Sequence, residues 1–201
     1  MLDIETLWDF GDPEGTEAIF RSLLAEASEV EKAILWTQIA RTFSLRKRFD
    51  EARAALENVG REDPEARTRF ELETGRIYNS SGQPDEAVPH FRSAMEIAKT
   101  AGLDYLYLDS LHMLAIADEP NVIEWAERGI EAAKTASEEK CRRWLGPFYN
   151  NLGWTYFDRG QYDKALELFE LGLEERERQG VPRPIEIAKE AVAEAKKALG
   201  R

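Results

Sequence analysis

Apolar residues recur at spacings of three and four along most of the chain, the pattern of amphipathic α-helices. In one segment such a series is followed by Asp158-Arg159-Gly160 and then by a second series. The members of the two series are Tyr149, Leu152, Gly153 and Tyr156, and then Ala165, Phe169 and Leu173. Because Gly160 can adopt a left-handed backbone conformation, it suits a helix end. The segment is predicted to form a helix, a tight turn and a second helix, with both series as packing residues.

This two-helix unit recurs with a period close to 35 residues. Ala52 and Ala87 occupy matching positions 35 residues apart, and the same step leads to Val122 in a third unit. The next matching residue, Ala165, follows only after 43 residues, so about eight additional residues precede the last unit. A hairpin of two helices cannot bury its apolar face alone. Stacking of successive units is therefore expected to form a continuous core.

The repeated motif resembles that of the tetratricopeptide repeat family. That motif places an aromatic residue, Leu-Gly and a second aromatic residue in a first helix, then Ala and a large apolar residue in a second. The last unit reads Tyr149-x-x-Leu152-Gly153-x-x-Tyr156, then Ala165-x-x-x-Phe169. The first full unit reads Trp36-x-x-Ile39-Ala40-x-x-Phe43, then Ala52-x-x-x-Leu56. The resemblance implies an all-α, right-handed α-solenoid of helix-turn-helix repeats.

The resemblance extends over most of the chain, with departures. The second unit keeps Gly75, Tyr78, Ala87 and Phe91 but has Glu71 at an aromatic position. A polar capping helix from about Pro184 to Leu199 is expected at the C-terminal end. The chain is interpreted as one solenoid domain, 1–201: a partial repeat (1–30), two repeats (31–65 and 66–101), a degenerate repeat (102–136), a repeat with an extended first helix (137–180) and the capping helix (181–201).

Charge and composition exclude several function classes. The net charge of −12 repels phosphate, so nucleic acid is not expected as a partner. No apolar run is long enough to span a bilayer, and the acidic N-terminal sequence lacks signal-peptide features, so we expect a cytoplasmic protein with no membrane association. One cysteine, Cys141, and two histidines, His90 and His112, are too few for a compact Cys/His metal site. No phosphate-binding loop or nucleophile motif occurs, so neither a cofactor nor a catalytic residue is expected.

The resemblance places candidate binding residues on the first helix of each repeat, which lines the concave groove in this family. Arginine and amide side chains there suit a carboxylate or an extended peptide backbone, and Trp154 offers a flat apolar surface. Alternatively, the arginines pair with glutamates such as Glu73 and contribute little. The positions are Thr37 and Arg41, then Arg69, Leu72, Arg76 and Asn79, and in the last repeat Asn150, Trp154 and Asp158. One register of the third repeat adds Tyr105, Asp109 and His112, whereas the opposite shift buries His112.

The sequence thus predicts a non-catalytic interaction module that binds an extended, acidic or C-terminal segment of another protein. Its groove residues are Arg41, Arg69, Arg76, Asn79, His112, Asn150 and Trp154. One alternative is a structural homo-oligomer, such as a homodimer, that associates through a solenoid face. Another is a small-ligand sensor or enzyme that uses Arg76, Asp109 and His112. In the additional residues, Arg142-Arg143-Trp144 forms either a flap over the groove or a segment in which Trp144 packs against the third repeat.

Overall fold

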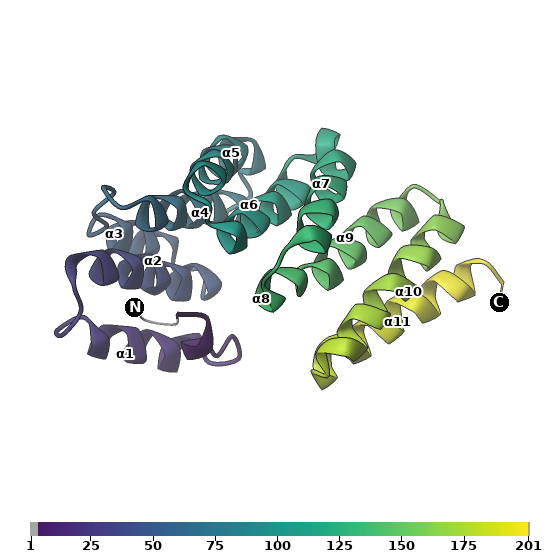
Figure 1. The fold of residues 1–201 in the computed structure, drawn as a ribbon, viewed down its shortest axis with the longest axis horizontal. Helices are drawn as coiled ribbons and strands as arrows, with labels where there is room; N and C mark the ends of the chain where they lie inside the picture. The colour runs from purple at the N-terminus through teal and green to yellow at the C-terminus, as the bar shows by residue number, and fades with distance from the viewer. Residues whose placement is uncertain (1–3, 201) are drawn as a thin grey trace. The chain divides into compact units, whose positions relative to one another are not determined.

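The structure, a computed structural model, describes residues 4–200, which form helices and loops without a β-strand (Figure 1). The all-α repeat fold expected from the sequence is confirmed. In chain order the elements are η1 (Ile4–Leu7), α1 (Pro13–Leu23), α2 (Glu29–Leu45), α3 (Phe49–Leu56), α4 (Pro64–Ser80), α5 (Pro84–Ala101), α6 (Asp104–Ala117), η2 (Glu119–Asn121), α7 (Val122–Thr135), α8 (Glu139–Arg142), α9 (Leu145–Asp158), α10 (Tyr162–Gln179) and α11 (Pro182–Ala198). None of the helices in this range is long and apolar enough to cross a lipid bilayer.

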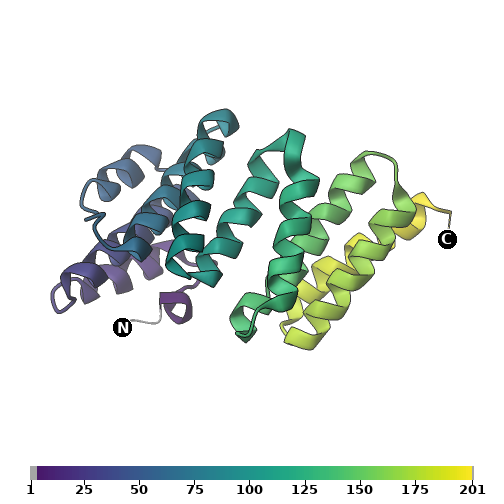
Figure 2. The same ribbon diagram turned by 45° about the horizontal axis from the view of Figure 1, so that its top comes forward.

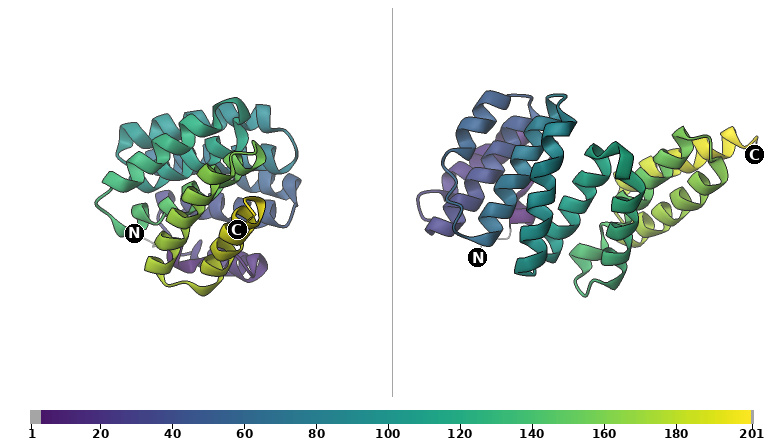
Figure 3. Two further views of the ribbon diagram at one scale, coloured as in Figure 1. Left: turned by 90° about the vertical axis from the view of Figure 1, so that its right-hand side faces the viewer. Right: turned by 90° about the horizontal axis from the view of Figure 1, so that it is seen from above.

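The chain divides into two compact units, Met1–Ser110 and Leu111–Arg201, with the boundary inside α6. In the first unit α4 and α5 form a hairpin, and α2 packs against both α3 and α4. In the second unit α10 packs between α9 and α11, and α7 packs against α9 (Figure 2). The view from above in Figure 3 shows the successive helices of each unit side by side. Whether the chain is one solenoid domain stays a prediction.

Helix boundaries follow local capping chemistry. Ser28 and Glu31 form a reciprocal capping box at the start of α2. The Asp63 carboxylate accepts hydrogen bonds from the backbone N–H groups of Glu65 and Ala66, which fixes the start of α4. Directly after α5, Gly102 has a φ of 68°, a left-handed conformation that costs glycine little. These side chains satisfy backbone groups that would otherwise have no partner at the helix ends.

The repeated alanines and large apolar residues form the core, as the sequence pattern predicts. Ala52, Ala87 and Phe91 are all 0% exposed in the first unit. In the second unit Ala165 is 0% exposed and Phe169 is 1% exposed. Gly75 and Gly153 in the first helices allow close approach of the second helices, because a Cβ atom at either glycine would meet the ring of Phe91 or Phe169. The residues of the repeat motif therefore serve to pack the helices together.

Tyr156 is an exception to the predicted packing. Its side chain is only half-buried, and the ammonium group of Lys164 lies 5.0 Å from the ring centroid. Tyr156 thus packs against the core cluster that contains Phe169, but it is a partly buried neighbour of that cluster and not one of its buried members. It lies at the edge of the α9–α10 contact, where a long cationic side chain covers one face of the ring.

The additional residues before the last repeat form a separate short helix. Because α8 ends at Arg142 and α9 begins at Leu145, the first helix of that repeat starts afresh and is not lengthened. Trp144 is half-buried, with its ring centroid 5.2 Å from that of His112 and 6.3 Å from that of Phe148. These contacts agree with packing against the third repeat and not with a projecting flap.

Candidate binding face

Three arginines and two carboxylates meet on one face of the first unit, formed by α2, α4 and the first turns of α6. Arg69, Glu73 and Arg76 are spaced by four and three residues along α4, so they point to the same side. Arg41 reaches this side from α2, and Asp109 reaches it from α6. We call this set, Arg41, Arg69, Glu73, Arg76 and Asp109, the binding face.

Arg76 is the centre of the face. Its guanidinium donates one hydrogen bond to Glu73 and another to Asp109. All three side chains are buried: Arg76 is 9% exposed, Glu73 1% and Asp109 5%. Burial by itself lowers the pKa of Arg76, but the charges of Asp109 and Glu73 outweigh it and raise that pKa above its usual range. Each of these buried charges has an opposite partner, which offsets the cost of removing it from water.

Arg41 has weaker polar contacts. Its Nη1 atom lies 3.5 Å from the Oε1 atom of Glu73, the longer of the two arginine contacts to this carboxylate. The guanidinium carbon lies 5.6 Å from the ring centroid of Trp8 and 5.4 Å from that of Phe10. Burial lowers the pKa of Arg41, and the neighbouring charge of Arg76 lowers it further. Arg41 is therefore held by two aromatic rings and one long ion pair.

Two buried polar atoms of the face have no hydrogen-bond partner within residues 4–200: Nε of Arg41, a donor, and Oε2 of Glu73, an acceptor. An unsatisfied buried group of this kind costs about 1 to 3 kcal/mol. Both atoms belong to side chains that already face each other. The face therefore retains one unused donor and one unused acceptor in the same neighbourhood.

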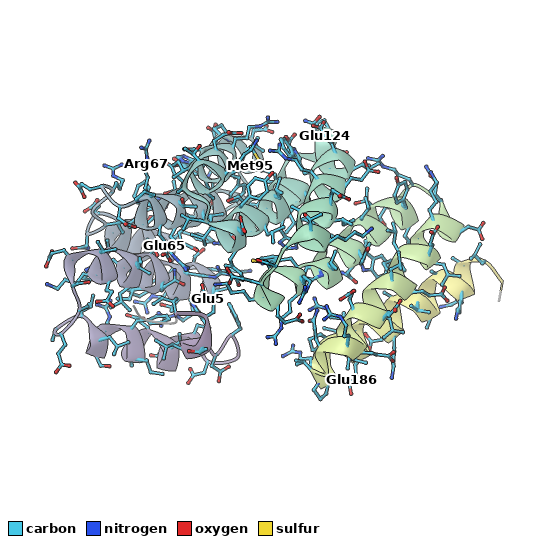
Figure 4. The ribbon with its side chains drawn as sticks, viewed as in Figure 1. Glu5, Glu65, Arg67, Met95, Glu124 and Glu186 are labelled. Carbon is cyan, nitrogen blue, oxygen red and sulfur yellow. The ribbon has the colours of Figure 1, made fainter. Side chains whose placement is uncertain are left out.

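Arg69 binds two carboxylates. Its Nε atom donates to Glu65 at 2.9 Å, and its Nη2 atom donates to Glu5 at 2.8 Å. Figure 4 shows Glu5 and Glu65 on the same side of α4, whereas Arg67 points to the opposite side. Burial opposes ionisation of Arg69, but Glu5 and Glu65 raise its pKa overall. The N-terminal segment thus supplies one of the charges that this face needs.

The segment before α1 covers part of the binding face. The indole N–H of Trp8 donates to the side-chain oxygen of Gln38 on α2 at 2.9 Å. The rings of Trp8 and Phe10 stack with their centroids 4.8 Å apart and their planes 8° from parallel. The ring of Trp8 also lies edge-on to the ring of Phe20 in α1, with the centroids 5.4 Å apart. Phe10 is 60% exposed, so it forms the outer layer of the stack.

The repeat family is shown by direct comparison. Two family models described as tetratricopeptide repeat match residues 74–105 and 147–178. The second match spans most of the α9–α10 hairpin, which carries the complete motif. The chain therefore contains tetratricopeptide repeats. Such repeats generally mediate binding between proteins and are typically non-catalytic.

A solved structure agrees with the fold of this tetratricopeptide repeat protein. The crystal structure of BtubC (BKLC) from P. vanneervenii is similar, with a TM-score of 0.66 and 19% sequence identity. The similarity covers 100% of this chain and 85% of that chain. At this identity the similarity concerns the fold alone. None of the curated proteins matches the sequence.

Most of the groove residues expected in the first unit of this tetratricopeptide repeat protein lie on the face. Tyr105 lies close enough to Arg41 and Arg69 for their charges to act on its pKa, and Asp109 accepts a hydrogen bond from Arg76. Burial, and then the charge of Asp109, raise the pKa of Tyr105 to about 12. The prediction was wrong for two residues: Thr37 is 0% exposed and Leu72 is 1% exposed, so both pack in the interior. Asn79 is half-buried in the last turn of α4.

The net charge of the face also differs from that expected of an arginine-rich groove. Its three arginines are balanced by four carboxylates, those of Glu5, Glu65, Glu73 and Asp109. The face is therefore rich in charge without being a net basic patch. Glu65 lies four residues before Arg69, so helical spacing could have identified this pair. Glu5 is 64 residues away, in a segment outside the repeats, and no local pattern identifies it.

In the second unit the expected groove residues have different surroundings. Trp154 packs against Phe169, with ring centroids 5.0 Å apart. The Nε2 atom of His112 lies 3.0 Å from the side-chain nitrogen of Asn151, a residue that the sequence did not single out. Asn150 lines a pocket of about 150 Å³. Asp158, at the end of α9, is exposed.

The alternative of a small-ligand sensor or enzyme that uses Arg76, Asp109 and His112 stays a prediction. Arg76 and Asp109 bind each other in the first unit. His112 packs against the rings of Trp144 and Phe148 in the second unit, at centroid distances of 5.2 and 5.6 Å. Over residues 4–200, no three His, Cys, Asp or Glu side chains gather as a metal site.

Proposed function

We propose that this protein is a non-catalytic interaction module whose binding face accepts an extended segment of another protein. The observation that carries the proposal is the pair of unsatisfied atoms, Nε of Arg41 and Oε2 of Glu73. A peptide group has a carbonyl oxygen that can accept from the first and an N–H that can donate to the second. An extended backbone is therefore chemically complementary to this pair.

The charge balance of the face favours recognition of a peptide backbone over attraction of any anion. Arg69 and Arg76 already hold carboxylates, so an additional negative charge would meet neutralised arginines. An acidic group of a partner fits only where it takes the place of a carboxylate that already pairs with an arginine of the face. The face is therefore selective, because a partner group without a matching charge would leave a buried charge unpaired.

A peptide selection tests the proposal. A displayed library of random 12-residue peptides is selected on the immobilised full chain, and the enriched peptide is measured by isothermal titration calorimetry. Arg41→Gln is expected to raise its Kd about tenfold, equivalent to roughly 1.4 kcal/mol. Arg53→Gln is the matched control, since Arg53 lies on α3 in a surface pair with Asp50 at 3.2 Å. Equal affinities of the two variants would contradict the proposal.

Two further predictions concern self-association and location in the cell. Exposed apolar residues such as Ile116, Leu171 and Ile187 are of the ordinary scattered kind, so no observation favours a homo-oligomer. We infer a cytoplasmic location from the sequence alone: one cysteine per chain offers no internal disulfide, as is usual for reducing compartments.

A further inference from the structure

We propose that the N-terminal segment Glu5–Phe10 is a resident ligand of the binding face, and that a partner segment of the same acidic-aromatic chemistry displaces it. This inference rests on the proposed function, because it names what the same face recognises and how access to it is controlled. The partner chemistry is a carboxylate followed, at three and five residues, by aromatic side chains, as in Glu5, Trp8 and Phe10.

The segment makes the contacts that a bound peptide would make. It reaches α2 through the hydrogen bond from Trp8 to Gln38, at 2.9 Å. It reaches α4 through the ion pair between Glu5 and Arg69, at 2.8 Å. These are the first helices of two consecutive repeats, and the labelled Glu5 in Figure 4 marks where the segment crosses toward α4. One short stretch, which begins in the 3₁₀ helix η1 (Ile4–Leu7), thus contacts both of these helices.

The two arginines that hold the segment are the ones expected to bind a partner. Arg69 binds the carboxylate of Glu5, and Arg41 lies against the rings of Trp8 and Phe10. A partner carboxylate that replaces that of Glu5 leaves the charge count of the face unchanged. Aromatic rings that replace Trp8 and Phe10 restore the cation–π contacts of Arg41. Exchange between two segments of the same chemistry therefore leaves no buried charge unpaired.

The resident segment leaves the face incompletely satisfied. Arg41 lies against both rings of the segment, yet its Nε atom is buried and has no hydrogen-bond partner. The Oε2 atom of Glu73 is likewise buried and has no hydrogen-bond partner. A partner that offers a peptide group to these two atoms gains hydrogen bonds that Glu5–Phe10 does not make. This difference gives the incoming segment an advantage over the resident one.

The exposure of the segment shows where opening can begin. Phe10 is 60% exposed and the Glu5 side chain 36%, so these outer contacts are the easiest to break. Ile4 is 3% exposed, and Trp8 packs against the core of the first unit. The free energy needed to release the segment therefore depends on these inner contacts. A resident competitor raises the apparent Kd of a partner in inverse proportion to the unoccupied fraction of the face.

A peptide in trans tests the inference. The fluorescein-labelled probe has the sequence of residues 1–12 of this chain, and its Kd is measured by fluorescence anisotropy on the full chain. Glu5→Ala/Phe10→Ala weakens the resident segment and spares Ile4 and Trp8. This variant is expected to bind the probe at least about tenfold more tightly than the wild-type chain does. A probe carrying Glu5→Lys is not expected to bind the variant more tightly than the wild-type chain, because its lysine would be repelled by the positive charge of Arg69.

The matched control is Glu14→Ala/Ile19→Ala, which also removes one acidic and one exposed apolar side chain, both on α1. It is expected to bind the probe as the wild-type chain does. Equal Kd values for the wild-type chain and the Glu5→Ala/Phe10→Ala variant, or equal binding of the lysine probe, would overturn the inference. A library peptide that binds with dependence on Arg41, while the probe does not bind, rejects the inference and leaves the proposed function intact.

If circular dichroism shows that the variant has lost helix, hydrogen exchange on the wild-type chain tests the inference instead. Excess unlabelled peptide of residues 1–12 is expected to speed exchange of the amides of residues 5–10 by at least about twofold, because their segment is released. The lysine-containing peptide is expected to leave their exchange unchanged. Unchanged exchange with both peptides would overturn the inference.

Discussion

The ring of Phe169 packs against Gly153 so closely that a Cβ atom at that glycine would lie 2.5 Å from the Cε1 atom of the ring. Gly75 and Phe91 form the same contact, also at 2.5 Å, in the α4–α5 hairpin. In each hairpin the glycine of the first helix admits the aromatic residue of the second. This contact explains in physical terms why the motif pairs a small residue with a large one.

Replacing Gly153 by alanine is expected to destabilise the chain by about 1 to 3 kcal/mol, because the ring and both helices must shift to admit the methyl group. Gly172→Ala is the matched control in α10, where a Cβ atom would lie 3.4 Å from the Cβ atom of Tyr149. There, alanine is expected to stabilise the chain by up to about 1 kcal/mol through its helix propensity. Urea denaturation measures both, and shifts of the same sign would contradict this account.

Phe169→Ala is expected to cost about 3 to 5 kcal/mol, since the removed ring leaves a cavity between α9 and α10. Tyr156→Ala is expected to cost less than about 2 kcal/mol, because the side chain is half-buried and its surroundings can relax. The free energies of unfolding of both variants are measured by urea denaturation against the wild-type chain. Equal losses would show that Tyr156 belongs to the core after all.

The sequence predicts the packing better than it predicts the binding face. Ala87 and Phe91 are predictable because the 35-residue period fixes which helical face repeats, and that face must be buried. Trp154 is less predictable: it follows Gly153 directly, and its large ring reaches Phe169 even though its position lies beside the core series. A wide aromatic side chain at the edge of a helix face can belong to either surface, and its neighbours decide which.

The polar contacts of the face depend on distant partners. Helical spacing relates Arg76 to Glu73, but its other partner, Asp109, lies 33 residues away on a helix of uncertain register. The Glu5–Arg69 pair lies outside any repeat, so periodicity carries no information about it. The sequence therefore predicts which arginines share a face, whereas the structure identifies the carboxylates that neutralise them.

Arg76→Met is expected to destabilise the chain by about 3 to 5 kcal/mol, because it leaves the buried carboxylates of Glu73 and Asp109 without their shared cation. Arg53→Met removes an arginine from a surface pair and is expected to cost less than about 1 kcal/mol. Thermal unfolding followed by circular dichroism compares the two variants. A loss for Arg76→Met no greater than that for Arg53→Met would mean that the buried network is not formed.

Glu17 predicts a pH dependence. Burial raises its pKa, but hydrogen bonds from Arg21 and Arg46 outweigh this effect and lower the pKa below the usual 4.5. A carboxylate with a lowered pKa in the folded state stabilises the fold above the unfolded pKa, and this contribution is lost as the pH falls through the folded pKa. The wild-type chain is expected to be more stable than Glu17→Gln at pH 7. The difference should shrink below pH 4.5, and urea midpoints at several pH values measure it.

The central claim is that the face formed by α2, α4 and the start of α6 receives a partner segment. The most direct measurement is a heteronuclear NMR titration of the full chain with the library-selected peptide. The account predicts that the largest shifts fall on residues around Gln38, Arg41, Glu73 and Arg76 and on the segment Glu5–Phe10. Shifts confined to α3 and α5, with the signals of Arg41 and Glu73 unmoved, would contradict it.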